Sequence, residues 1–201
     1  DNWGCFLIPL ASAGLKAESV GVRTGLRASY LSHLTLKGVQ VPLDARLDEG
    51  DALPLLMRTL SLNWLGLAAI GAGIARGAVK AARKYASERY QGGTMLENHP
   101  VIRMLIAGAE SNMEAASALV TRAADMGPGE LELMRACAIA RLTGLQLSAE
   151  AVTDSLQVFG GYGYMEDYGM EKRLRDVTVL KSMAGTPQYL KQFIFESGEV
   201  C

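Results

Sequence analysis

The chain has 201 residues, of which 49% are hydrophobic and 20% are charged, and its formal net charge at pH 7 is −1. This length and composition are those of an ordinary globular protein that can bury a sizeable core in one or two domains. The near-neutral charge argues against a nucleic-acid partner, because such binding needs Lys and Arg gathered on one face.

The numbers and positions of cysteines and histidines limit which disulfides and metal sites the chain can form. Cys5, Cys137 and Cys201 are odd in number and far apart, which fits neither a disulfide framework nor a zinc spacing. We therefore expect a reducing compartment, the cytoplasm or, in a eukaryote, the mitochondrial matrix. With only His33 and His99 in the chain, we predict no metal site.

The residue pattern of the first fifty residues is typical of β-strands. Cys5–Ile8 is a short apolar run, and Leu34–Pro42 alternates apolar with polar positions. Turns are predicted at the glycines that separate these runs, Gly14, Gly21, Gly25 and Gly38. Three or four strands cannot make an independent sheet with protected edges, so residues 1–50 are predicted to be the end of a larger β domain that continues upstream.

From Asp51 the apolar positions recur at helical spacing, which predicts one long helix ending near Gly92-Gly93. Its most apolar stretch, Leu62–Ala75, is shorter than a membrane span and includes Asn63. We expect this stretch to be a buried helix and the chain to have no membrane span.

Further helices are predicted after it. A second helix follows Asn98-His99-Pro100 and is closed by Gly127-Pro128-Gly129, and a third runs from about Glu130 to Phe159. Shorter helices are expected over 169–182 and 186–195. The predicted fold is mainly α: an antiparallel helical bundle over 51–201, preceded by the C-terminal part of a β-barrel-like domain over 1–50, α+β overall.

Three segments in the bundle carry residues that packing alone does not explain. The first is Ser87–Gly93, where Arg89 stands beside glycines that let the backbone bend around a ligand. The alternative is a charged last helical turn with glycine caps. The second is Gln157–Tyr164, with a glutamine and three glycines, and its alternative is a glycine helix stop.

The third segment is Ala184–Gln188, a glycine turn that leads into the last helix. Thr186 is a candidate N-cap and Pro187 suits the first helical position. Helix N-termini present free N–H groups that favour phosphates, while the alternative is simply a well-capped surface helix.

The order and spacing of these segments resemble the C-terminal half of the acyl-CoA dehydrogenase family. Arg89-Tyr90-Gln91-Gly92-Gly93 is similar to the family's Arg-x-Gln-Phe-Gly end of the long helix, with Gly92 in place of phenylalanine. Gln157–Tyr164 matches its Gln-x-Phe-Gly-Gly-x-Gly-Tyr segment. Two more segments look like its Glu-Lys-x-x-Arg-Asp helix and its Glu-Gly-Thr-x-Gln turn, namely Glu171–Asp176 and Ala184–Gln188. Upstream, Gly25–Ser29 and Val39–Pro42 resemble the end of its middle β domain.

The resemblance implies FAD as cofactor and assigns residues to it. Arg89 would reach the pyrophosphate of an FAD bound mainly by a neighbouring subunit, and a guanidinium fork suits that contact. Three residues would line the same dinucleotide: Gln157, Gly160 and Gly161. Thr186 and Gln188 would contact the flavin of this chain's own site. Such sharing implies a homo- or hetero-oligomer, a dimer or tetramer.

The resemblance also implies a reaction. In the family a glutamate removes the proton α to the thioester of an acyl-CoA, hydride leaves the β carbon for the flavin, and 2-enoyl-CoA forms, as in fatty-acid β-oxidation. Electrons then pass to electron-transfer flavoprotein. The two positions where members carry this glutamate are Ala184 and Asn63 here, so we assign no catalytic residue.

Four explanations for the missing base stay open: an unusual carboxylate, a base in another part of the protein, a base from a partner subunit, or no activity. The carboxylates nearest the matched segments are expected to face water; they are Glu88, Glu97, Glu166 and Asp167.

The first interpretation is therefore a subunit or fragment of an FAD-dependent acyl-CoA dehydrogenase. The alternative is a non-catalytic partner subunit that completes the FAD site and the oligomer of a heteromeric dehydrogenase. A helical interaction module without cofactor is disfavoured, because three separate segments match one cofactor site in the right order.

Overall fold

The computed structural model describes residues 3–48, 50–126 and 130–198. The chain divides into two compact units, residues 1–60 and 61–201. This division falls inside the first long helix, and the proposed domains, 1–50 and 51–201, stay a prediction. The expected end of the second helix at Gly127-Pro128-Gly129 lies outside the described residues.

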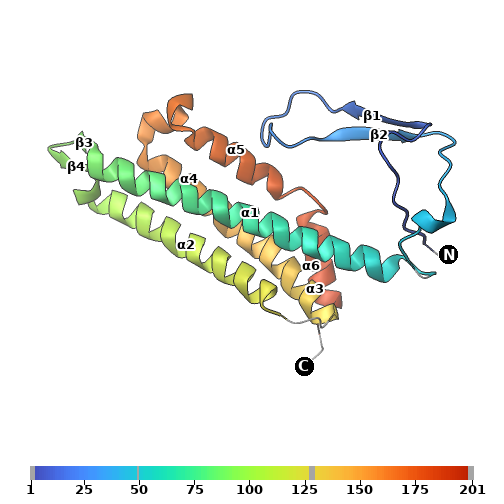
Figure 1. Ribbon diagram of the computed structural model, residues 1–201. Helices are drawn as coiled ribbons and strands as arrows, with labels where there is room; N and C mark the ends of the chain where they lie inside the picture. Colours follow the sequence, from blue (N-terminus) through green and yellow to red (C-terminus); the bar gives the residue numbers. More distant parts are fainter. Residues whose placement is uncertain (1–2, 49, 127–129, 199–201) are drawn as a thin grey trace. The chain divides into compact units, whose positions relative to one another are not determined.

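The first unit contains one antiparallel hairpin, drawn in blue in Figure 1. Its strands are β1 (Leu15–Ser19) and β2 (Ser32–Leu36), with Ala17 opposite Leu34. A short 3₁₀ helix, η1, follows at Leu43–Ala45.

The expected strand at Cys5–Ile8 is wrong: only Phe6 forms an isolated bridge, with Arg46. The predicted strand over Leu34–Pro42 is also misplaced, because β2 ends at Leu36 and Gly38 turns the chain at φ 62°. A strand needs a hydrogen-bonded neighbour along its length. Within the described part of this unit, Leu34–Leu36 pairs with β1, and Cys5 and Leu7 are joined by single backbone hydrogen bonds to Leu47 and Ala45. Neither pairing extends along the whole predicted strand.

The helices follow in the expected order. The first three are α1 (Leu53–Glu88), α2 (Pro100–Ala124) and α3 (Glu130–Ile139). A π-helical segment, Ala140–Gly144, joins α3 to α4 (Leu145–Val158), so the predicted third helix is one run with a widened turn in it. Two shorter helices close the chain, α5 (Met170–Leu180) and α6 (Pro187–Glu196).

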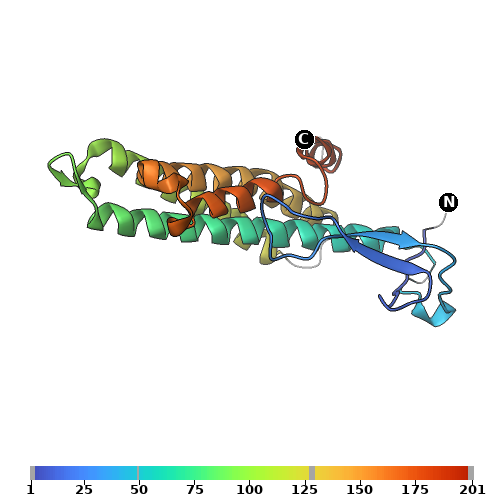
Figure 2. The ribbon, with the colours of Figure 1, turned by 90° about the horizontal axis from the view of Figure 1, so that it is seen from above.

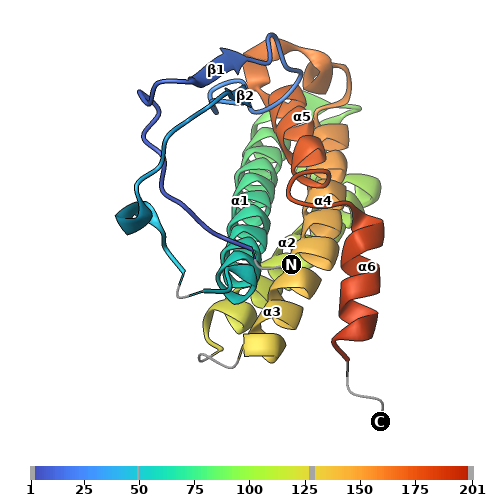
Figure 3. The ribbon, with the colours of Figure 1, turned by 90° about the vertical axis from the view of Figure 1, so that its right-hand side faces the viewer.

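The helices form an antiparallel bundle whose core is built mainly from small side chains. Figure 1 shows α1, α2 and α4 side by side, and Figure 3 shows them nearly end-on with α5 next to α4. The four helices share one buried cluster that includes Ala75, Ala78, Val79, Ala82, Ala109, Met113, Ala151, Val152, Met170 and Val177. Small residues let helix axes approach closely. A Cβ on Gly71 of α1, for example, would lie 2.3 Å from Cδ2 of Leu145 on α4.

The long helix α1 is buried on one face only. Trp64, Leu67 and Ala68 are buried, whereas Leu62 and Ile70 are about half exposed. The stretch expected to be a buried helix, Leu62–Ala75, is thus buried on its inner face and partly exposed on its outer face. Among the described residues, α1 is the helix with the length and composition to cross a membrane, a weak sign because core helices of soluble proteins meet the same test.

Candidate functional site

Arg89 directly follows α1 and opens a small β-hairpin. The hairpin pairs β3 (Tyr90–Gln91) with β4 (Thr94–Met95), and Figure 2 shows it projecting at the end of the bundle where α1 meets α2. Gly92 and Gly93 have φ of 63° and 87°, the consecutive positive values that a tight two-residue hairpin turn requires. The glycines thus form a hairpin turn and do not cap α1. The backbone N–H of Leu96 donates to the carbonyl of Arg89 at 2.9 Å, which fixes the base of the hairpin.

An aromatic cluster ties this end of α1 to the end of α4. The rings of Tyr85 and Phe159 are stacked, with centroids 4.3 Å apart and planes 19° apart. Tyr168 meets both rings edge-on, at 5.7 Å and 5.5 Å. Burial raises the pKa of Tyr85 above its ordinary value. The cluster brings the first and second predicted segments to the same end of the bundle.

The guanidinium of Arg89 lies over the face of Tyr162, with Cζ 5.0 Å from the ring centroid. This is the geometry of a cation–π contact, which attracts the cation to the ring face. Within the part of the chain that the structure describes, no hydrogen-bond acceptor is recorded for this guanidinium. Arg89 therefore has a fixed position and donors free for an anionic ligand.

The glycine turn after α4 leaves its backbone open. Gly160 has a φ of 55°, and a Cβ at Gly160 or Gly161 would meet nothing within 4 Å. Gly163 is different, because a Cβ there would lie 2.7 Å from the carbonyl oxygen of Leu156. The side chain of Gln157, in the last turn of α4, is exposed. A ligand can thus approach the main chain at residues 160 and 161.

The third segment begins α6 as expected. The Oγ1 of Thr186 accepts a hydrogen bond from the backbone N–H of Tyr189 at 3.2 Å, and Pro187 is the first helical residue. The side chains of Thr186 and Gln188 are exposed. The N-cap assignment is confirmed, and the N-terminal turn of α6 is accessible to a ligand.

One hydrogen bond links the turn that carries Ala184 to α1, the helix that carries Asn63. Trp64, next to Asn63 on α1, donates from Nε1 to the carbonyl of Ala184 at 2.8 Å. Ala184 has a φ of 54°, a left-handed conformation that non-glycine residues rarely adopt. Neither position carries a carboxylate. Sequence reasoning did not foresee this contact, since nothing in the pattern shows where the indole N–H points.

The carboxylates expected to face water do so. Glu88 is exposed and lies 3.9 Å from the ammonium of Lys84, a surface pair one helical turn apart. The others, Glu97, Glu166 and Asp167, are exposed as well. Across the described ranges, no group of three His, Cys, Asp or Glu side chains could hold a metal ion.

The six predicted cofactor residues form two groups. Arg89 lies with the segment that carries Gln157, Gly160 and Gly161 at one end of the bundle. Thr186 and Gln188 follow α5, whose 11 residues span about 16 Å. The structure does not gather all six around one point, and their roles as ligands stay predictions.

The structure is an antiparallel helical bundle with an open glycine turn, an accessible helix N-terminus and an arginine that has no recorded acceptor among the described residues. Such a helical domain is suited to an anionic cofactor. Residues 50–198 match the family described as acyl-CoA dehydrogenase, C-terminal domain, and the chain belongs to the acyl-CoA dehydrogenase family of oxidoreductases.

Individual relatives agree with this assignment. The chain is 32% identical, over 97% of its length, to a short-chain-specific acyl-CoA dehydrogenase of Clostridium acetobutylicum, covering 51% of that protein. It is 30% identical, over 94% of its length, to subunit CarC of a caffeyl-CoA reductase–Etf complex of Acetobacterium woodii, covering 50% of it.

Among solved structures, butyryl-CoA dehydrogenase of Megasphaera elsdenii superposes with a TM-score of 0.90 at 26% identity, over 96% of this chain and 51% of that one. The chain therefore spans about half the length of the relatives that it matches.

Proposed function

We propose that this chain is the C-terminal part of an FAD-dependent acyl-CoA dehydrogenase that converts acyl-CoA thioesters to 2-enoyl-CoA. The observation that carries the proposal is the guanidinium of Arg89, held over Tyr162 with free donors beside the open backbone of Gly160 and Gly161. The charge of this guanidinium and its N–H donors suit a pyrophosphate, which accepts paired N–H bonds from a guanidinium.

The residues present fit FAD at two places. Arg89, Gln157, Gly160 and Gly161 would hold one FAD by its pyrophosphate. Thr186 and Gln188 would hold the flavin of another through the N-terminal turn of α6. When bound, FAD supplies the acceptor for the hydride that leaves the β carbon of the thioester. An oligomer, a dimer or tetramer of like or unlike subunits, follows from this division of the two groups.

The proposed partners follow from the same assignment. Acyl-CoA thioesters are the substrates, and electron-transfer flavoprotein takes the electrons. The relative from Acetobacterium woodii, named as a subunit of an Etf complex, supports that partner. A site in the cytoplasm, or in the mitochondrial matrix of a eukaryote, is part of the proposal.

A second candidate function rests on a specific observation. The two positions that would supply the base are Ala184 and Asn63, and neither side chain can take a proton from carbon. This favours a non-catalytic subunit that completes the FAD site of a heteromeric dehydrogenase. A base from elsewhere in the protein would preserve the first function.

Anaerobic mixing of the purified full-length protein, in its native complex, with a panel of acyl-CoA thioesters separates the two functions. Loss of the main visible flavin absorbance with any thioester is expected for a working dehydrogenase. Bound flavin that never loses this absorbance would favour the non-catalytic subunit, and a protein without flavin would contradict both.

A further inference from the structure

Arg141 is a buried cation on the π-helical segment Ala140–Gly144, and its side chain is only 1% exposed. No ion pair with a carboxylate is recorded for it within the described ranges, and its Nε has no hydrogen-bond partner. Burial lowers the pKa of Arg141, but a guanidinium keeps its charge at neutral pH. A charge in this setting must be compensated by other groups.

The compensation comes from three backbone carbonyls in one stretch of chain. Nη2 of Arg141 donates to the carbonyl oxygens of Lys181 at 3.4 Å, of Met183, and of Gly185 at 2.6 Å. Since α5 ends at Leu180, these oxygens lie just beyond the negative end of its dipole. Arg141 thus joins the end of α5 to the turn that precedes α6.

That turn has a conformation that needs outside support. Ala184 and Gly185 have φ of 54° and 109°, and a non-glycine residue in the left-handed region persists only where its surroundings fix it. The carbonyl of Ala184 accepts from Nε1 of Trp64, whose side chain is fully buried. Three successive carbonyls, at residues 183, 184 and 185, are therefore each held by a buried donor from another helix.

The location of Arg141 is also unusual. Single π-helical turns inside α-helices occur frequently at functional sites. This one carries the residue that holds the turn, and Thr186, the N-cap of α6, follows the turn directly. The structure thus connects a buried arginine to the accessible N-terminal turn of α6.

We propose that Arg141 is a positioning residue that, together with Trp64, fixes the turn at Met183–Gly185 and so presents Thr186 and Gln188 to the flavin in one geometry. The inference rests on the proposed function, because it assigns the consequence of the fixed turn to FAD binding. Arg141 itself does not touch the cofactor in this account.

The test compares three variants of the full-length protein in its native complex. Arg141→Met removes the donor. Arg141→Lys keeps a cation, and because all three contacts of Arg141 come from Nη2, the three N–H groups of a lysine ammonium can replace them. Arg135→Met is the matched control, because Nε of Arg135 donates to the carbonyl of Ile194 at 3.4 Å, near the other end of α6. FAD dissociation constants, amide hydrogen exchange over residues 184–190 and melting temperatures are measured for each.

We expect Arg141→Met to speed exchange in the turn and to weaken FAD binding roughly tenfold or more, as expected for the loss of charge-assisted hydrogen bonds. Arg141→Lys should recover most of both effects. Arg135→Met should lower the melting temperature without changing FAD affinity. This split separates positioning of the cofactor from a general contribution to stability.

The proposal is overturned if Arg141→Met binds FAD as wild type does, whatever its melting temperature. If Arg141→Met does not fold, Trp64→Phe replaces it, because phenylalanine keeps an aromatic ring and loses the donor to Ala184; unchanged FAD affinity in that variant overturns the proposal as well. A wild-type protein that binds no FAD would instead contradict the proposed function, and exchange in the turn would still decide whether Arg141 holds it.

Discussion

The guanidinium of Arg89 keeps its charge while it lies over the face of Tyr162, which attracts the cation. Arg89 directly precedes the β3–β4 hairpin, and the ring of Tyr162 lies beside Tyr85, with centroids 6.5 Å apart. The arginine is therefore positioned before any ligand arrives, which reduces the entropy lost on binding.

Removing the ring should weaken FAD binding even though Tyr162 carries no charge. We expect Tyr162→Leu to raise the FAD dissociation constant by about two- to thirtyfold, since cation–π contacts contribute about 0.5–2 kcal/mol. Tyr162→Phe should bind FAD like wild type because it keeps the face of the ring. Equilibrium titration by flavin fluorescence measures the FAD dissociation constants of wild type, Tyr162→Leu and Tyr162→Phe. Tyr164→Leu, at a side chain that is 86% exposed, is the control, and equal affinity for Tyr162→Leu and this control would contradict the role.

The residue at position 184 allows a direct test of the missing base. We expect Ala184→Glu to raise the rate constant of flavin reduction by acyl-CoA roughly 10²- to 10⁴-fold, the usual contribution of a general base, because the position is held by the contact with Trp64. Stopped-flow absorbance under anaerobic conditions measures the rate. Ala184→Gln, which has similar size and no basic oxygen, should have no effect. Equal rates for both variants and wild type would show that the base lies elsewhere.

At the scale of elements, two glycines on α1 face different surroundings. A Cβ at Gly71 would collide with the buried side chain of Leu145, whereas a Cβ at Gly73 would meet nothing within 4 Å. We expect Gly71→Ala to destabilise the protein by about 1–3 kcal/mol through overpacking. Gly73→Ala should stabilise it by up to about 1 kcal/mol through helix propensity. Urea unfolding of the full-length protein measures both, and effects of the same sign would contradict the packing of α1 on α4.

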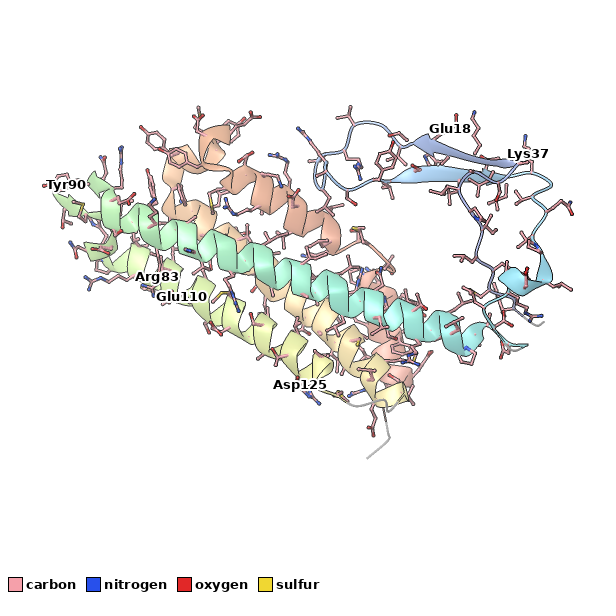
Figure 4. All side chains as sticks on the ribbon, viewed as in Figure 1. Glu18, Lys37, Arg83, Tyr90, Glu110 and Asp125 are labelled. Carbon is pink, nitrogen blue, oxygen red and sulfur yellow. The ribbon has the colours of Figure 1, made fainter. Side chains whose placement is uncertain are left out.

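The pair of Arg83 on α1 and Glu110 on α2, labelled in Figure 4, should make stability depend on pH. The hydrogen bonds from Arg83 lower the pKa of Glu110 below its ordinary value. A lowered folded-state pKa contributes stability above the unfolded pKa, about 4.3, and this contribution is lost as pH falls through the folded value. Because the pair is partly exposed, we expect Glu110→Gln to cost less than about 1 kcal/mol at pH 7.

As the pH is lowered from about 5 to 3, the melting temperature of Glu110→Gln should fall less steeply than that of wild type. Glu114→Gln, one helical turn further along α2, is the control, because Glu114 is exposed and has no recorded ion pair in the described part of the chain. An unchanged pH profile for Glu110→Gln would show that the pair contributes no measurable stability.

The helices were predictable from the sequence because their apolar spacing is regular over many turns and their ends carry glycine, proline or a capping threonine. The strands of the first unit could not be predicted in the same way, because an apolar run such as Cys5–Ile8 becomes a strand only where a neighbouring strand pairs with it. The π-helical turn and the indole contact to Ala184 leave no local signal. Arg141 did leave one, because it is an arginine at an apolar position of the third predicted helix.

At the scale of the molecule, the chain spans about half the length of its relatives, and its first unit exposes many large apolar side chains. Val22 is 98% exposed, Tyr30 93% and Leu43 85%. Such exposure in a small unit fits a surface that further polypeptide covers in the working protein. We therefore expect the proposed activity to require the full-length protein in its oligomer.

The most direct test of the account is the affinity of the full-length protein for FAD, measured by equilibrium titration of the apoprotein for wild type, Arg89→Met and the exposed control Arg122→Met. We predict that wild type and the control bind one FAD per subunit equally well, and that Arg89→Met binds roughly ten- to a hundredfold more weakly, as expected for the loss of charge-assisted hydrogen bonds to a pyrophosphate. Equal affinity for all three proteins, or no binding by wild type, would contradict the central claim that this bundle completes an FAD site.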